Sequence, residues 1–319
     1  MSEPDLRALI VGPIATVPTA FKASYEVDYA RMAAATEQWI ANGLVRGRSV
    51  LKVAASIGEG QMLREAEWAR LLTTVVEAAA GRVPVLGAIH HKDTVRTVED
   101  AKRAADAGVV ALQISPPIFN QPTQDDLLRY FGAVSDQIDL GIIVYATPVF
   151  RFGAIQPETF ARMTDFERVV AIKWTPPDGV AYEAIFDLAD RFNILDNDRQ
   201  AVVCHRLGGR GFLMDGISAY PPYYLGVWDL LEARRYDEAE AEWERVTTPL
   251  WQLYRRAIAR SGGDGKVEKA MSELMGLPMG PPRPPSVALT VAEMTELRAL
   301  MACWGWPVPT PDPSDSTTG

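Results

Sequence analysis

A lysine and a tyrosine, each at the end of an apolar run, are the residues of this sequence whose types and spacing could do covalent chemistry. Val169-Val170-Ala171-Ile172 leads into Lys173, and residues 140–144 lead into Tyr145, 28 positions earlier. Burial disfavours an ammonium ion, and an uncharged lysine amine is a nucleophile that attacks ketones. A neighbouring phenol can carry the protons that this attack requires. The pair predicts imine chemistry, with a lysine that reaches the surface or pairs with a carboxylate as the structural alternative.

Apolar runs alternate with helix-like segments through residues 1–235. The expected strands are residues 6–11, 49–55, 83–89, 109–114, 140–145, 169–173, 193–195 and 211–214. A strand-and-helix repeat of roughly 25 to 30 residues is typical of βα units with a parallel sheet. Eight units predict an α/β fold, a (β/α)8 TIM barrel over residues 1–235. An open doubly wound sheet is disfavoured, because Gly12-Pro13-Ile14-Ala15 is not the glycine-rich turn of dinucleotide-binding folds.

The pattern becomes purely helical from about Tyr236. Residues 236–304 contain three segments with helical spacing, separated by Gly262-Gly263 and by a proline cluster at 278–285. We expect them to form a C-terminal helical extension packed on the barrel, which serves packing or oligomer contacts rather than chemistry. Residues 305–319, rich in proline, threonine, aspartate and serine, are expected to be a disordered tail.

Composition argues against several classes of partner. The 319 residues carry a net charge of −9, whereas nucleic acid and anionic membranes are bound by basic patches. Cys204 and Cys303 provide neither a disulfide framework nor metal-ligand spacing, and no metal site is expected. No apolar run reaches the roughly 18 residues of a membrane span, and the acidic start is unlike a signal peptide. We expect a cytoplasmic protein.

The active site of a TIM barrel lies at the carboxyl ends of its strands. The candidate residues that follow the expected strands are Ser56, Ile57, His90, His91, Phe119, Tyr145, Lys173, Trp174, Asp196 and Asp198. Adjacent strand residues point opposite ways, so one histidine at most, His90 or His91, is expected to face the mouth, where it could serve as a proton shuttle. Asp196 and Asp198 either contact a polar part of the substrate or are solvated loop residues.

Several short motifs, in their order and spacing, resemble the dihydrodipicolinate synthase / N-acetylneuraminate lyase superfamily of class I pyruvate aldolases. Ala55-Ser56-Ile57-Gly58-Glu59 resembles the family's Gly-Thr-Thr-Gly-Glu loop, and Tyr145-Ala146-Thr147-Pro148 its Tyr-Asn-x-Pro motif. Ala171-Ile172-Lys173 resembles its Schiff-base strand, and Gly208-Gly209-Arg210-Gly211 its Gly-Gly-x-Gly. The resemblance implies that Lys173 forms an imine with a 2-oxo acid and that Tyr145 moves protons. It also implies that Ser56 and nearby amides hold the carboxylate of the 2-oxo acid.

Departures from the family pattern narrow the expected substrate. Ile57 removes one hydroxyl of the carboxylate-binding loop, and Ile118-Phe119 replaces two tyrosines of a proton relay, which argues against dihydrodipicolinate synthase itself. Phe150 stands in the place of a family arginine, and Arg151 follows it. Tyr-Ala-x-Pro resembles the trans-o-hydroxybenzylidenepyruvate hydratase-aldolase branch, which releases an aromatic aldehyde and pyruvate. We expect Ile57, Phe119, Phe150 and Trp174 to line an apolar pocket for an aryl group, with ordinary barrel packing as the alternative.

The sequence therefore predicts a Schiff-base-forming lyase, an aldolase or hydratase-aldolase, with pyruvate or a larger, aryl-substituted 2-oxo acid and an aldehyde as its small-molecule partners. The covalent imine with Lys173 requires no cofactor. A sugar-acid dehydratase or aldolase of the same superfamily is the second interpretation. A barrel that has lost catalysis and acts as a ligand sensor is the third. The resemblance also implies a homo-oligomer, either a tetramer or a dimer.

Overall fold

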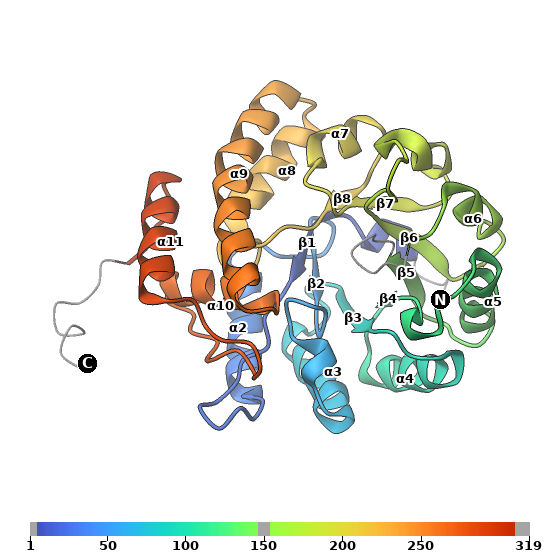
Figure 1. Cartoon of the computed structure of the whole chain (residues 1–319), viewed down its shortest axis with the longest axis horizontal. Coiled ribbons are helices and arrows are strands. Elements are labelled where there is room, and N and C mark those ends of the chain that lie inside the picture. Colours follow the sequence, from blue (N-terminus) through green and yellow to red (C-terminus); the bar gives the residue numbers. More distant parts are fainter. Residues whose placement is uncertain (1–4, 146–153, 310–319) are drawn as a thin grey trace.

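Eight parallel strands close into a barrel at the centre of the molecule (Figure 1). The computed structural model describes residues 5–145 and 154–309. Within these ranges the strands are β1 (Gly12–Thr16), β2 (Val50–Lys52), β3 (Val85–Ile89), β4 (Ala111–Ile114), β5 (Gly141–Tyr145), β6 (Val169–Trp174), β7 (Asn193–Asp196) and β8 (Gly211–Phe212). Each strand pairs with the next, and β8 pairs with β1. The predicted (β/α)8 TIM barrel is confirmed.

Helices lie around the outside of the barrel (Figure 1). They are α2 (Tyr29–Ala41), α3 (Glu65–Ala79), α4 (Thr94–Ala107), α5 (Gln124–Ser135), α6 (Pro157–Arg162), α7 (Ala201–Arg206) and α8 (Pro221–Glu232). Local signals set their ends: Asp93 caps the first turn of α4, and Gly108 ends this helix with a φ of +87°. Between β6 and β7 the chain forms the 3-10 helix η3 (Tyr182–Leu188) in place of an α-helix. Two further 3-10 turns are η1 (Gly60–Met62) and η2 (Ile118–Asn120).

The first apolar run was assigned to the wrong element. Residues 6–11 were expected to form a strand, but α1 (Leu6–Leu9) occupies most of them and β1 begins at Gly12. The Asp5 carboxylate accepts hydrogen bonds from two amides of α1, which fixes its start. Leu6 packs against the apolar cluster inside the barrel. A short apolar run does not distinguish a strand from a helix of this kind.

The barrel interior has an apolar layer followed by a polar one. The apolar layer includes Ile14, Val50, Ala111, Ile143 and Ala171, which belong to one buried cluster. Two residues further along the same strands come Thr16, Lys52, Gln113, Tyr145 and Lys173. Because side chains alternate between the two faces of a strand, residues two apart share a face. The strands therefore direct a layer of polar side chains inward at the carboxyl end of the barrel.

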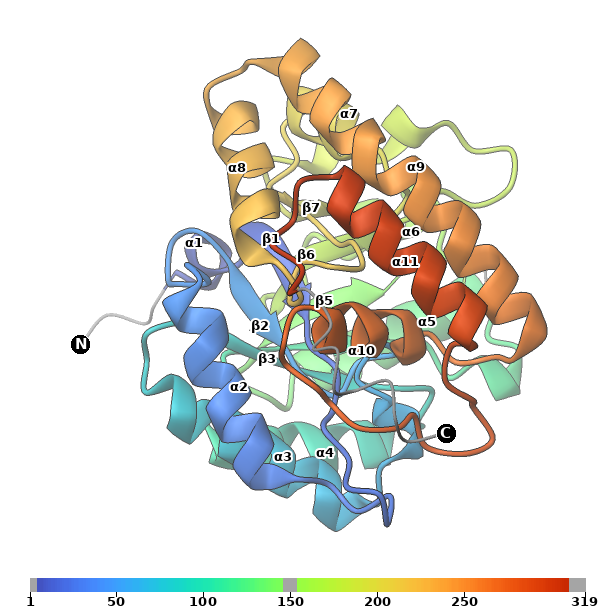
Figure 2. The ribbon, with the colours of Figure 1, turned by 90° about the vertical axis from the view of Figure 1, so that its left-hand side faces the viewer.

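The C-terminal extension consists of α9 (Tyr236–Arg260), α10 (Gly265–Leu274) and α11 (Val291–Cys303), which lie together on one flank (Figures 1 and 2). The buried Glu268 of α10 accepts hydrogen bonds from the Gly216 amide and the Ser218 hydroxyl after β8. The tail expected from residue 305 begins with ordered structure, because Trp306 is 4% exposed and packs against the Tyr220 ring. In the described ranges, no helix combines the length and the apolar character that a bilayer crossing requires.

Candidate active site

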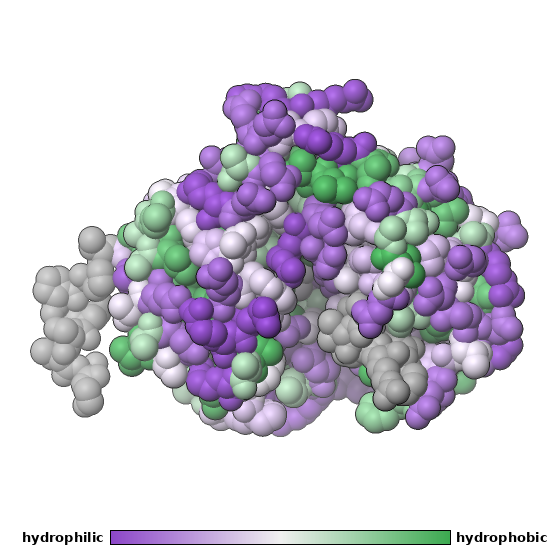
Figure 3. Space-filling model, turned by 45° about the horizontal axis from the view of Figure 1, so that its top comes forward, coloured by the Kyte–Doolittle hydropathy of each residue, from purple (hydrophilic) through white to green (hydrophobic). Residues whose placement is uncertain are grey.

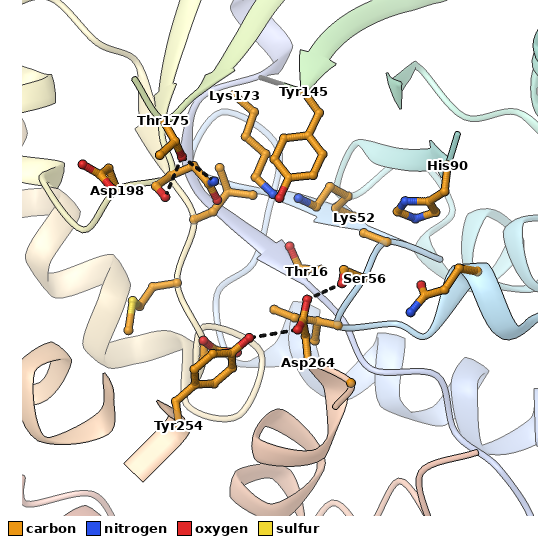
Figure 4. A pocket seen from close by; sticks show the side chains of 18 of the residues that line it. Thr16, Lys52, Ser56, His90, Tyr145, Lys173, Thr175, Asp198, Tyr254 and Asp264 are labelled. Atoms are coloured by element: carbon orange, nitrogen blue, oxygen red, sulfur yellow. Dashed lines mark hydrogen bonds between the residues drawn. The ribbon is translucent and has the colours of Figure 1, made fainter. Parts of the chain in front are cut away.

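A cavity of about 780 Å³ lies at the carboxyl ends of the strands, where the loops of the barrel meet the C-terminal extension (Figure 4). The ends of β1, β2, β5 and β6 form its floor, and α9 and the turn before α10 contribute to one wall. The space-filling view in Figure 3 is hollowed near its middle, between mainly hydrophilic residues. The cavity is the place at which a TIM barrel presents its reactive groups.

Lys173 and Tyr145 meet in this cavity. They are register partners on the adjacent parallel strands β6 and β5. Lys173 is 8% exposed, and its Nζ lies 3.7 Å from the centre of the Tyr145 ring. The lysine faces the interior because Ala171, two residues earlier, belongs to the interior cluster. A ketone in the cavity would meet an amine and a phenol from neighbouring strands.

Sequence reasoning missed a second lysine in the same cavity. Lys52, at the end of β2, is 1% exposed, and its Nζ donates a hydrogen bond to Gln113 Oε1 over 2.8 Å. Burial and, after it, the charge of Lys173 hold the pKa of Lys52 well below its usual range. A signal was present in the sequence, because Leu51-Lys52-Val53 places a lysine inside an apolar run, as Ile172-Lys173 does.

Ser56 reaches the cavity, but its hydroxyl already has a partner. Ser56 Oγ donates a hydrogen bond to one oxygen of Asp264, and the Tyr254 hydroxyl donates to the other over 2.9 Å (Figure 4). A hydroxyl has one proton to donate, so neither hydroxyl can donate to a substrate in this arrangement. Tyr254 and Asp264 come from the C-terminal extension, whose role is therefore wider than the packing expected from the sequence.

The loop of residues 55–59 is held in place by Glu59. This residue is 4% exposed, and its Oε1 lies 2.6 Å from Lys269 Nζ of α10. Its Oε2 accepts a hydrogen bond from the Arg283 amide over 2.7 Å. The carboxylate thus ties the cavity loop to the C-terminal extension.

Both histidines after β3 line the cavity, so the expectation that one at most faces the mouth is wrong. The strand ends at Ile89, and His91 has a φ of +54°, which breaks the strand alternation on which that expectation depended. His90 Nε2 lies 3.2 Å from the Ala54 carbonyl oxygen and must carry the proton, because a carbonyl only accepts. Burial lowers the pKa of His90 to about 4, so its ring is neutral near pH 7.

The aromatic pocket expected from the sequence is not formed by the residues named for it. Trp174 is fully buried behind the strand, where its Nε1 donates to the Tyr182 carbonyl, because alternation turns it away from the face of Lys173. Phe119 in η2 is 90% exposed and does not line the cavity. Ile57 does line it. Phe150, with Ala146, Thr147, Pro148 and Arg151, lies outside the described residues.

A different aromatic wall, missed by sequence reasoning, comes from α9. The rings of Trp251 and Tyr254 stack with centroids 5.2 Å apart and an interplanar angle of 14°, and both residues line the cavity. The Arg199 guanidinium carbon lies 4.0 Å from the centre of the Trp251 ring. The spacing of three residues places both rings on one face of the helix, which is a signal that could have found them.

Carboxylates near the cavity have separate roles. Asp196 is fully buried and accepts hydrogen bonds from the Tyr182 hydroxyl and two backbone amides, so it fixes the turn after β7. Asp198 lines the cavity. Asp215 also lines it, and burial followed by the charge of Glu268 raises the pKa of Asp215 well above its usual range. Among the described residues, no group of three or more histidine, cysteine or acidic side chains could hold a metal ion.

A family model supports the resemblance suggested by the motifs. The model of the dihydrodipicolinate synthetase family matches residues 10–303. The chain belongs to the dihydrodipicolinate synthetase family. As a member of it, the chain is a Schiff-base-forming carbon–carbon lyase that depends on pyruvate. The finer assignment to the hydratase-aldolase branch finds no support in the relatives described below.

Members of the dihydrodipicolinate synthetase family resemble this chain over most of its length. Proteins named 4-hydroxy-tetrahydrodipicolinate synthase from Acidothermus cellulolyticus and Heliobacterium modesticaldum are 28% and 29% identical to it. The first alignment covers 82% of both chains, and the second covers 92% of this chain and 95% of the relative. Dihydrodipicolinate synthase structures from Thermotoga maritima and Acinetobacter baumannii, the latter complexed with pyruvate, superpose with TM-scores of 0.83 and 0.81. They are 24% and 20% identical and each covers 93% of this chain and 99% of its own, a likeness of fold.

Proposed function

We propose that Lys173 is the imine-forming residue of this lyase and that Tyr145 carries its protons. The amine attacks the ketone carbon of a 2-oxo acid, and the carbonyl oxygen leaves as water once it has been protonated. When the carbon two bonds from the imine carbon (C4 of the acid) carries a hydroxyl, the protonated imine accepts the electron pair of the C3–C4 bond while Tyr145 takes the hydroxyl proton, which releases an aldehyde and leaves an enamine. Protonation of the enamine and hydrolysis of the imine return pyruvate and the free amine.

The contact between Lys173 Nζ and the Tyr145 ring in the cavity carries this proposal. Both side chains enter from adjacent strands, so one ketone carbon can lie within reach of the amine and the phenol together. Lys173 is largely buried, so water has little access to an imine formed there.

We propose an aryl-substituted 2-oxo acid as the larger substrate, cleaved to an aromatic aldehyde and pyruvate. The stacked rings of Trp251 and Tyr254 offer an apolar surface for an aromatic ring, and Ile57 adds an apolar side chain to the lining of the same cavity. A sugar acid is the second candidate, because Thr175, Asn197 and Asp198 line another part of the cavity with hydrogen-bonding groups. Hydratase activity, the addition of water to a carbon–carbon double bond before cleavage, is proposed only for the aryl-substituted substrate.

Borohydride reduction in the presence of pyruvate tests the imine. The expected product is one pyruvate-derived group per chain, attached to the peptide that contains Lys173 and absent from Lys173→Met. A label on another lysine, or no label under conditions that modify another family member, would refute the proposal. Tyr145→Phe should lower turnover by about 10²–10⁴-fold if the phenol transfers protons.

Substrate screening separates the proposed substrates. Condensation of pyruvate with aromatic aldehydes supports the aryl proposal, whereas turnover of deoxy sugar acids without aryl condensation supports the second. Saturable binding of pyruvate with no reducible imine would favour the ligand sensor and remove both enzymatic proposals.

A further inference from the structure

Lys52 is a buried lysine without an anionic partner among the described residues. Lys52 Nζ has one hydrogen-bond acceptor in the part of the chain that the structure describes, the neutral side-chain amide of Gln113. A lysine ammonium has three protons to donate, and Lys52 lines the cavity. A buried ammonium without a carboxylate is costly unless something supplies the missing charge.

We propose that Lys52 binds the carboxylate of the 2-oxo acid whose ketone reacts with Lys173. This assignment rests on the proposed function and adds to it the group that recognises the acid. It gives the role of carboxylate binding, expected for Ser56, to a lysine on the neighbouring part of the cavity floor. The chemical class of the ligand is any compound with a carboxylate directly attached to a ketone.

The place of Lys52 in the barrel suits this role. Lys52 and Lys173 belong to the same interior layer, each two residues beyond a member of the apolar cluster. Their side chains enter the same part of the cavity (Figure 4). The carboxylate of a 2-oxo acid is bonded to the carbon that the amine attacks, so its binding group must lie in the layer of that amine. Thr16 is the register partner of Lys52 on β1 and places a hydroxyl beside it.

The surroundings of Ser56 make Lys52, and not the serine hydroxyl, the better partner for a substrate carboxylate. The Ser56 hydroxyl donates its proton to Asp264, whose carboxylate also accepts from Tyr254. A substrate carboxylate placed there would meet an acceptor where it needs a donor, and a negative charge next to its own. At Lys52 it would meet a positive charge and unused donors instead, and a charge-assisted hydrogen bond is among the stronger contacts available to it.

The charge that faces Lys52 favours the binding of an anion beside it. Lys173 on β6 disfavours the ammonium form of Lys52, the neighbouring His90 ring is neutral near pH 7, and the described residues provide no carboxylate that pairs with Lys52. A bound carboxylate would compensate the charge of a protonated Lys52. Substrate binding then supplies the countercharge that the fold leaves out.

Two ketones that differ only in charge test the proposal: pyruvate and its methyl ester, which keeps an activated ketone but has no carboxylate. Reductive trapping on the full-length protein is measured against the concentration of each ketone for the wild type, Lys52→Met, Lys52→Gln and Lys102→Met. Lys102 lies exposed on α4 and serves as the matched control. For Lys52→Met we expect a half-saturating pyruvate concentration about 10- to 100-fold higher, because a charged hydrogen bond is lost. Trapping of methyl pyruvate should stay within about 3-fold of the wild type, since that ketone does not use the ammonium.

Methyl pyruvate separates the loss of carboxylate binding from an effect of the substitution on Lys173 or on folding. Equal losses for both ketones in Lys52→Met and Lys52→Gln would overturn it, because Lys52 would then act on Lys173 or on the fold. Unchanged pyruvate trapping in both variants would overturn it as well. If the wild type traps neither ketone, the proposed function itself fails, and the carboxylate assignment fails with it. Trapping of methyl pyruvate by Lys52→Met also shows that this variant is folded.

Discussion

Replacing the buried Glu59 by glutamine should lower the free energy of unfolding more than the replacement of any exposed charged residue. Its carboxylate and Lys269 Nζ lie 2.6 Å apart with both side chains about 5% exposed or less. At an effective dielectric constant of about 20, two unit charges at 2.6 Å attract by about 6 kcal/mol, and burial takes back several kcal/mol of hydration. Glu59→Gln leaves the Lys269 ammonium with the Pro281 carbonyl and the Phe21 ring as its remaining partners. We expect the free energy of unfolding to fall by about 3–5 kcal/mol.

Urea unfolding at equilibrium, followed by circular dichroism, measures this change. Glu37→Gln is the matched control. Glu37 and Arg82 also form a short ion pair, but both side chains are about half exposed. We therefore expect no measurable change in the free energy of unfolding for this variant. The double variant Glu59→Gln/Lys269→Met should recover part of the loss, since it removes the unpaired charge. A loss below about 1 kcal/mol for Glu59→Gln would refute the reasoning, because the buried pair would then contribute no more than an exposed one.

Three further outcomes are expected. Gly60→Ala should abolish stable folding or shift the loop, because a Cβ would lie 1.7 Å from the Ala54 carbonyl oxygen, whereas Gly226→Ala in α8 meets no atom within 4 Å and should be tolerated in the same thermal melts. Burial raises the pKa of Glu268 from 4.5 to about 7, so between these two pH values the folded state holds a proton that the unfolded chain has lost. Its contribution to stability is therefore complete below about pH 4.5 and lost as the pH rises through about 7, and Glu268→Gln should flatten that part of a plot of unfolding midpoint against pH. Trp174→Phe should cost about 1–3 kcal/mol in urea unfolding, because it leaves a buried backbone carbonyl without its donor.

The barrel was predictable because its signals are local and repeated. Seven of the expected strands overlap those of the structure, and Lys173 and Tyr145 end β6 and β5 as the apolar runs indicated. The failure at residues 6–11 shows the limit of this kind of reasoning. Whether Leu6 belongs to a strand or to a helix depends on Asp5 and on contacts with the barrel interior, which come from distant parts of the chain.

The cavity was predictable only where strand order alone determines which residues meet. Alternation explains both success and failure: it directs Lys173 inward and for the same reason turns Trp174 outward. Applied to β2 it would have found Lys52 as well. Asp264 and Tyr254 could not be assigned to the cavity in this way, because they reach Ser56 through the packing of the extension against the barrel. No local pattern in the sequence encodes that contact.

Lys52 brings the demands of folding and of chemistry into conflict. The interior layer to which it belongs does not require polar side chains, because Ala88 on β3 occupies the corresponding place, two residues beyond Leu86 of the apolar cluster. An apolar side chain at residue 52 would avoid the burial of an ammonium beside a neutral amide, which is unfavourable for folding. Departures of this kind from stable packing are expected at functional sites. Chemistry at the carboxyl end of the barrel, rather than packing, therefore accounts for a lysine in this place.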